Sequence, residues 1–212
     1  MRVIMAMLLG LAFTHSARAE GESAGDFDYY VMSLSWSANW CALKGDDRGD
    51  AQCDTGRGLT FILHGLWPQY ERGSPSFCPS GQRDPTRAET QAMSDVMGGA
   101  NVAWYQWKKH GRCAGMPARD YLALLRRAYG SVVVPPIFAK ISTDLKVSAE
   151  VIEAAFLESN PGLARDQVTV TCTQGMIQEV RICLTPGLEP RRCGADVIRD
   201  CTMTDAALDA VR

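Results

Sequence analysis

The pattern of apolar and polar positions predicts four strands. They cover residues 27–36, 59–67, 167–172 and 176–184. The first (FDYYVMSLSW) is rich in aromatic and β-branched residues and partly alternates with polar ones, whereas the second (LTFILHGLW) is apolar enough to be fully buried. The last two flank Gln174-Gly175, which is typical of a turn between paired strands.

Helical periodicity predicts four helices, at residues 86–97, at 101–110, at 118–129 and after Ser148. Asn101 is a suitable N-cap, Gly111 a suitable stop, and Leu122, Leu125 and Tyr129 form one apolar stripe. We expect loops at residues 42–58 and 70–85 and from Pro186 onward. Together these elements predict a single α+β domain over residues 20–212, with a central, mostly antiparallel sheet packed by helices.

Residues 1–19 have a different pattern, which is typical of a secretory signal. Arg2 precedes an apolar run from Val3 to Phe13, and Ala17-Arg18-Ala19 offers the small residues of a cleavage site before Glu20. The run is too short to span a membrane. We therefore expect a secreted or periplasmic protein without membrane association after cleavage; the alternative is a buried N-terminal helix.

Eight cysteines, all after the signal, indicate disulfides. They are Cys41, Cys53, Cys78, Cys113, Cys172, Cys183, Cys193 and Cys201. An even number in an exported chain predicts four bridges, and spacing alone leaves 105 pairings open. The alternative, structural zinc, usually shows close Cys-x-x-Cys pairs, and this sequence has none.

Charge and histidine content restrict the possible chemistry. Cleavage of residues 1–19 removes Arg2, Arg18 and His15 but no acidic residue, so the formal charge changes from −2 to −4. A mildly acidic protein lacks the broad basic surface of many nucleic-acid binders, so any RNA contact must be a local cleft. Two histidines remain, His64 and His110.

The segment around His110 carries groups suited to phosphoryl transfer. Gln106, Lys109 and His110 share one face of the predicted helix, where they offer an amide, a cation and an imidazole. Lys109 should favour the neutral imidazole through like-charge repulsion. His64 ends an apolar strand, and Trp67 beside it could stack on a base. The plainer alternatives are a core histidine at 64, a solvated Lys109 and core tryptophans at 67 and 107.

Two segments resemble the active-site segments of the T2 family of ribonucleases: HGLWPQ (residues 64–69) and WKKHGRC (residues 107–113). The resemblance extends over about residues 25–202. It implies a metal- and cofactor-independent endoribonuclease that cleaves single-stranded RNA through a 2′,3′-cyclic phosphate. His110 would be the general base, His64 the general acid and Lys109 the stabiliser of phosphoryl charge. The need for a 2′-hydroxyl excludes DNA.

The resemblance also implies further site residues and the bridges 41–53, 78–113, 172–201 and 183–193. Trp67 would lie at a base pocket, with Gln69 as a base-edge contact. Tyr105-Gln106 replaces the family's usual His-Glu, so Tyr105 would bind phosphate without charge and Gln106 could not titrate. Loss of that carboxylate should lower the pKa of His110. We expect a reduced rate or a less acid pH optimum.

Two other functions remain open at this point. The Tyr105-Gln106 pair is compatible with a catalytically impaired relative that binds RNA or a protein on the same fold. A metal-dependent phosphodiesterase would need more histidine and carboxylate ligands than two histidines comfortably supply. We expect the protein to be a monomer.

Overall fold

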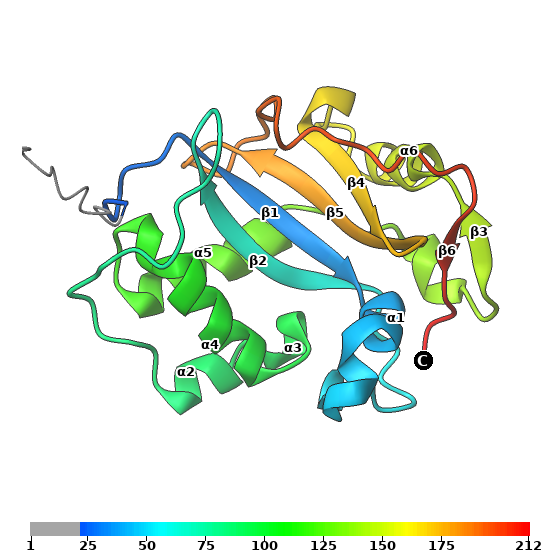
Figure 1. Cartoon of the computed structure of the whole chain (residues 1–212), viewed down its shortest axis with the longest axis horizontal. Helices are drawn as coiled ribbons and strands as arrows, with labels where there is room; N and C mark the ends of the chain where they lie inside the picture. The colour runs from blue at the N-terminus through cyan, green and yellow to red at the C-terminus, as the bar shows by residue number, and fades with distance from the viewer. Residues whose placement is uncertain (1–21) are drawn as a thin grey trace, which may run out of the picture.

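The computed structural model describes residues 22–212, so the predicted signal over residues 1–19 lies outside it (Figure 1). The strands are β1 (Tyr29–Trp36), β2 (Phe61–Gln69), β3 (Leu145–Val147), β4 (Val168–Thr173), β5 (Met176–Leu184) and β6 (Ala206–Leu208). The helices are α1 (Ser37–Trp40), α2 (Arg87–Gln91), α3 (Ser94–Met97), α4 (Ala100–Lys109), α5 (Ala118–Gly130) and α6 (Ala149–Ser159). Among the described residues, no helix has the length and apolar character needed to cross a membrane.

The strands form one sheet in the order β2-β1-β5-β6-β3, with β4 also paired to β5. All strand pairs are antiparallel except β5 with β6, which run parallel and meet at Met176 and Ala207. Helices α4 and α5 contact β2, and α6 contacts β4 (Figure 1). The predicted α+β domain with a mostly antiparallel sheet is confirmed.

The two faces of β1 separate the core from a more polar surface, because successive strand residues point to opposite faces. Tyr30, Met32, Leu34 and Trp36 enter the main core, where the helices supply further buried side chains. Each such side chain contributes about 1.5–3 kcal/mol on burial. The other face carries Tyr29 and Val31 at one end and the buried hydroxyls of Ser33 and Ser35 at the other.

The four disulfides have the pairing implied by the family resemblance: Cys41–Cys53, Cys78–Cys113, Cys172–Cys201 and Cys183–Cys193. No cysteine is free, so thiolate ligands for structural zinc are absent from the described chain. Each bridge stabilises the fold by roughly 2–4 kcal/mol, mainly by restricting the unfolded chain. Cys78–Cys113 fastens the chain just after α4, close to His110.

Four sequence predictions of local structure were wrong in detail. The helix predicted over residues 86–97 is divided into α2 and α3. Gly98, in the left-handed conformation, ends α3, and Gly99 rather than Asn101 is the N-cap of α4. The loop predicted at residues 42–58 contains helical turns, and the C-terminal loop contributes β6. β3 and β6 have three residues each, too few for an alternating pattern to be visible.

Glu153 makes the stability of this fold depend on pH. It is buried on α6, and burial, together with a hydrogen bond to Asp200 and the charge of that carboxyl, raises its pKa to about 8. Asp200 in turn accepts hydrogen bonds from Thr169 Oγ1 and from the amide of Val170. The folded protein therefore keeps a proton that the unfolded chain releases near its ordinary pKa of 4.5.

We predict that, as the pH rises from 5 to 8, the melting temperature of Glu153→Gln decreases less, relative to that of the wild-type protein. In this range the folded state keeps a proton on Glu153 that the unfolded state releases, so the contribution of Glu153 to stability decreases as the pH rises from 4.5 through 8. The lowered pKa of His110 has the opposite effect below about pH 6.5, and it is common to both proteins. Glutamine keeps a hydrogen-bonding group at this position without titrating. Thermal unfolding followed by circular dichroism tests this, and equal pH slopes for the two proteins would contradict it.

Candidate active site

A bulge in the edge strand places His64. β1 and β2 pair Ser33 with Gly65 and Leu34 with Leu63, so His64 is left without a partner in the ladder. A bulge redirects the side chain of the extra residue. His64 is 29% exposed, so it is not a core histidine.

The indole of Trp67 connects the two histidines. His110 stacks against it with ring centroids 5.1 Å apart and planes inclined by 27°, and His64 meets it edge-on at 5.5 Å. Trp67 Nε1 donates a hydrogen bond of 2.7 Å to Gln106 Oε1, which ties β2 to α4. The structure therefore brings together four residues predicted from sequence: His64, Trp67, Gln106 and His110.

An acidic and a basic residue on β5 complete the cluster. His64 Nδ1 lies 2.6 Å from Glu179 Oε1. Arg181 donates to Glu179 Oε2 through Nε at 2.9 Å and Nη2 at 2.7 Å, and its guanidinium lies 5.4 Å from the Trp67 ring centroid. Sequence reasoning missed both residues. The available signal was two opposite charges at alternate positions of a strand that is otherwise largely apolar.

The two imidazoles have opposite electrostatic surroundings. Burial lowers the pKa of His110 to about 3, and the charges of Lys109 and His64 add to this against the opposing charge of Glu179. The predicted effect of Lys109 is thus confirmed in direction. His110 Nδ1 is enclosed and has no hydrogen-bond partner in the described chain. Burial alone would raise the pKa of Glu179, but its contacts with His64 and Arg181 lower it to about 2.

The remaining predicted site residues lie around this cluster. Lys109 is half-buried and makes no ion pair within residues 22–212. Tyr105 is 53% exposed on the outer side of α4. Gln69 is buried, and its amide nitrogen donates to the carbonyls of Pro68 at 2.9 Å and Trp67 at 3.4 Å. Trp107 is a core residue, as its plainer interpretation held.

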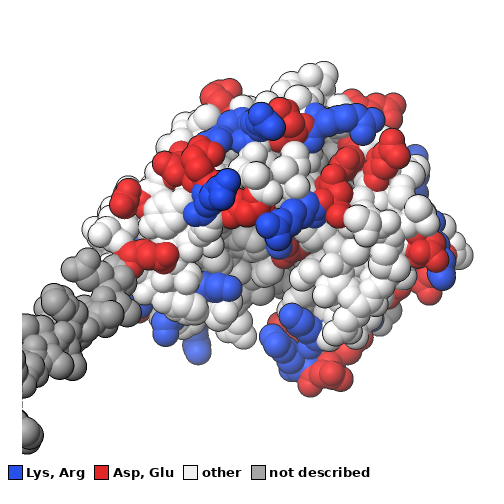
Figure 2. All heavy atoms as spheres, turned by 45° about the horizontal axis from the view of Figure 1, so that its top comes forward, with Lys and Arg blue, Asp and Glu red and all other residues white. Residues whose placement is uncertain are grey.

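A small cavity adjoins His64, and a larger groove shares Val102 with that cavity. The cavity, of about 40 Å³, is lined by His64, Ser35 and Val102 among others. Val102 also lines the groove, of about 1140 Å³, which carries Arg48, Arg57 and Arg87. Basic and acidic side chains are intermingled on the face in Figure 2, which fits the expectation that any RNA contact is local.

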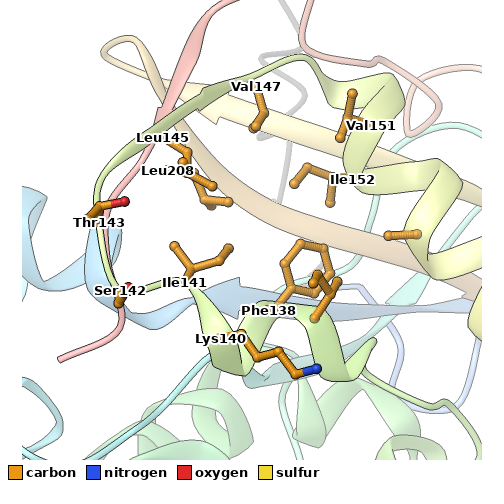
Figure 3. Close-up of a pocket in the computed structure, with 12 residues that line it drawn as sticks. Phe138, Lys140, Ile141, Ser142, Thr143, Leu145, Val147, Val151, Ile152 and Leu208 are labelled. Carbon is orange, nitrogen blue, oxygen red and sulfur yellow. The ribbon is translucent and has the colours of Figure 1, made fainter.

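An apolar cavity of about 340 Å³ lies elsewhere, between α6, β3 and β6 (Figure 3). Isoleucine, leucine, valine and phenylalanine side chains form most of its walls, and Lys140 is the titratable residue among those that line it. Without an imidazole or carboxylate pair, it lacks the groups for acid–base chemistry.

One group of possible metal ligands is present in the described residues: Cys41, Asp46 and Cys53. Both sulfurs are joined in a disulfide and cannot bind zinc as thiolates. The histidine cluster itself offers two imidazoles and one carboxylate, and Glu179 is already hydrogen-bonded on both oxygens.

The fold and site define a disulfide-bonded α+β protein with two imidazoles arranged around one indole. The model of the Ribonuclease T2 family matches residues 27–193, and the chain belongs to this family. A ribonuclease of Aeromonas hydrophila is 44% identical over 119 residues, which are 56% of this chain and 52% of that protein. A ribonuclease-like storage protein of Panax ginseng is 29% identical over 112 residues, 44% of this chain and 42% of that one.

The solved structure of an RNase-related protein from Calystegia sepium has the same fold. The TM-score is 0.67 with 19% sequence identity, over 88% of this chain and 99% of that one. The chain thus spans nearly the whole of this solved relative but about half the length of the two curated relatives described above.

We predict that Gly65→Ala lowers activity on RNA by about 10²-fold, as misplacement by about 1 Å can. A Cβ at position 65 would lie 2.3 Å from Trp67 Nε1 and 2.4 Å from Gln106 Oε1, so it would break the bond that joins them. Activity per folded molecule tests this, with Gly130→Ala as control because nothing described lies within 4 Å of a Cβ there. Equal activity of the two variants would contradict the prediction.

Proposed function

We propose that the protein is an endoribonuclease that cleaves single-stranded RNA by transesterification, with His110 as general base and His64 as general acid. The observation that carries the proposal is the placement of two imidazoles against the same indole, one stacked and one edge-on. A phosphodiester bound across Trp67 would have a proton-accepting group on one side and a proton-donating group on the other.

The reaction needs no nucleophile from the protein. His110 takes the proton of the ribose 2′-hydroxyl as its oxygen forms a bond to phosphorus. The bond from phosphorus to the 5′-oxygen breaks, and His64 gives that oxygen a proton. The products are a 2′,3′-cyclic phosphate and a 5′-hydroxyl, so atoms and charge balance without a metal or cofactor.

The surroundings of each histidine support this division of roles. His110, with a pKa of about 3, is neutral at physiological pH and can accept a proton. The negative charge of a bound phosphodiester would raise this pKa and favour the transfer. Glu179 faces His64 and stabilises the positive charge of a proton donor.

Other residues have supporting roles in the proposal. Lys109, next to His110 and without an ion pair in the described chain, would bind the non-bridging phosphoryl oxygens. Gln106 Oε1 accepts from Trp67, which leaves its amide N–H groups for the phosphate. Trp67 and Gln69 would contact a base and Tyr105 a phosphate. The arginine-lined groove, which shares Val102 with the cavity at His64, offers a path for the adjoining strand.

We predict that His64→Ala and His110→Ala each reduce RNA cleavage by roughly 10²–10⁴-fold, as expected for loss of a general acid or base. Initial rates on a single-stranded RNA at pH 7 test this. Wild-type cleavage in the presence of a chelator should continue and give cyclic-phosphate ends. Near-normal activity of either variant would contradict the assignment.

The second candidate function is a catalytically impaired protein that binds RNA or another protein. It is favoured by the Tyr105-Gln106 pair and by the storage-protein name of the ginseng relative. The same assay distinguishes the two functions: intact RNA together with measurable RNA binding supports this second function, and chelator-resistant cleavage supports the first.

We predict that Lys109→Met moves the acid limb of the kcat/KM profile to higher pH and lowers its maximum on the order of 10²-fold. Loss of the cation raises the pKa of His110, so the base becomes protonated at a higher pH. In the wild-type protein the acid limb should lie below pH 5. This direction differs from the less acid optimum expected from sequence, because a lower pKa keeps a base neutral to lower pH; the reduced rate, given there as the other outcome, stays a prediction.

The control for this profile is Lys108→Met. Lys108 is exposed and lies over the ring of Trp104 rather than at the histidines. Its loss should leave the acid limb in place. A limb that moves equally in both variants would show a general charge effect and would overturn the role of Lys109.

A further inference from the structure

Glu179 is a charged residue placed where charges are rarely found. It lies in β5, near the middle of the sheet, and is 2% exposed. Its backbone partners are Ser35 on β1 and Thr171 on β4. A buried carboxylate is costly unless it is paired and hydrogen-bonded, so its contacts show what it is retained for.

Both carboxylate oxygens of Glu179 have defined partners. Oε1 faces His64 Nδ1, and Oε2 accepts two hydrogen bonds from Arg181. The neighbouring hydroxyls of Ser35 and Thr171 are buried but form no hydrogen bond to it or to any other described residue. The charge of the carboxylate is therefore shared between one imidazole and one guanidinium.

On the α4 side of the site, no carboxylate of the described chain is hydrogen-bonded to His110. Gln106, on α4, is neutral and uses its oxygen to accept from Trp67. Two other ionisable groups close to His64 are bases: Arg181, which shares Glu179 with it, and His110. In the described chain, Glu179 is the carboxylate hydrogen-bonded to either imidazole.

We propose that Glu179 is a positioning residue for the general acid. It accepts the Nδ1 proton of His64, so that the protonated ring presents its Nε2 proton to the leaving 5′-oxygen and, once neutral, keeps the proton on Nδ1. The fork of Arg181 fixes the orientation of the carboxylate. RNA cannot reach Glu179 directly because it is buried beneath His64. This inference rests on the proposed function. It adds the residue that determines which nitrogen of neutral His64 carries the proton.

The test compares two substrates that differ in their need for an acid. An RNA 5′-oxygen is a poor leaving group and must be protonated, whereas 4-nitrophenolate in uridine 3′-(4-nitrophenyl phosphate) leaves without a proton. Glu179→Gln should lower kcat on RNA on the order of 10²-fold with little change in KM. On the activated ester it should change kcat less than about threefold.

Three further variants make the result specific. His64→Ala should show the same substrate dependence as Glu179→Gln, and His110→Ala should lose activity on both substrates. Glu153→Gln is the control for replacement of a buried glutamate by glutamine; it makes the same replacement on α6, away from the histidines, and it should leave both activities unchanged.

The outcomes separate this inference from the proposed function. Equal losses on both substrates for Glu179→Gln, with the histidine variants as expected, would show a merely structural role and overturn the inference alone. A His64→Ala variant that loses both activities equally would instead refute His64 as the acid.

A measurement on the wild-type protein does not depend on how a variant folds. Imidazole ¹⁵N spectra of the histidine-labelled protein, assigned with His64→Gln, should show neutral His64 with its proton on Nδ1, hydrogen-bonded to the carboxylate. The Nε2-protonated tautomer for neutral His64 would overturn the inference.

Discussion

The arrangement of the site depends on the indole of Trp67, because it is the surface on which the edge strand and helix α4 meet. Its N–H bonds to Gln106, its face stacks on His110, its edge meets His64, and Arg181 lies over it. Neither histidine is hydrogen-bonded to the other within the described residues. Their relative position is therefore set by packing against a rigid ring that lies between them.

Charged residues are tolerated on the polar face of the sheet because each of them contacts another member of one cluster. His64, Glu179 and Arg181 follow one another by hydrogen bonds, and Arg181 covers the indole that His64 also touches. Breaking one member would leave a buried charge without compensation, which is costlier than never having placed it. Rigidity of the site and stability of the sheet thus come from the same contacts.

Sequence reasoning found the parts of this site that have a local signal. The helical spacing of Gln106 and His110 was visible in the chain, and the disulfide pairing came with the family resemblance. The expectation that the strand ends at His64 was wrong, because β2 continues to Gln69 and a bulge, not a strand end, exposes the ring. Glu179 was missed because its relation to His64 runs across β1, through two strand pairs, and depends on a register that no local pattern contains. The short strands β3 and β6 were missed for the same reason, since distant pairing defines them.

Two identical side chains can divide the work of an acid and a base only if their surroundings differ, and here the difference comes from the fold. His110 is enclosed at the end of α4 beside a lysine, which disfavours its charged form. His64 projects from a bulge, and its Nδ1 lies 2.6 Å from the carboxylate of Glu179. In the proposed reaction, His110 takes a proton although its surroundings disfavour a positive charge, and His64, which faces a carboxylate, gives one. Substrate binding must reverse that preference, because the phosphodiester supplies next to His110 the negative charge that the empty protein lacks there. In this proposal, the protein alone keeps His110 neutral, and the negative charge of the bound RNA would stabilise the protonated ring that forms during the reaction.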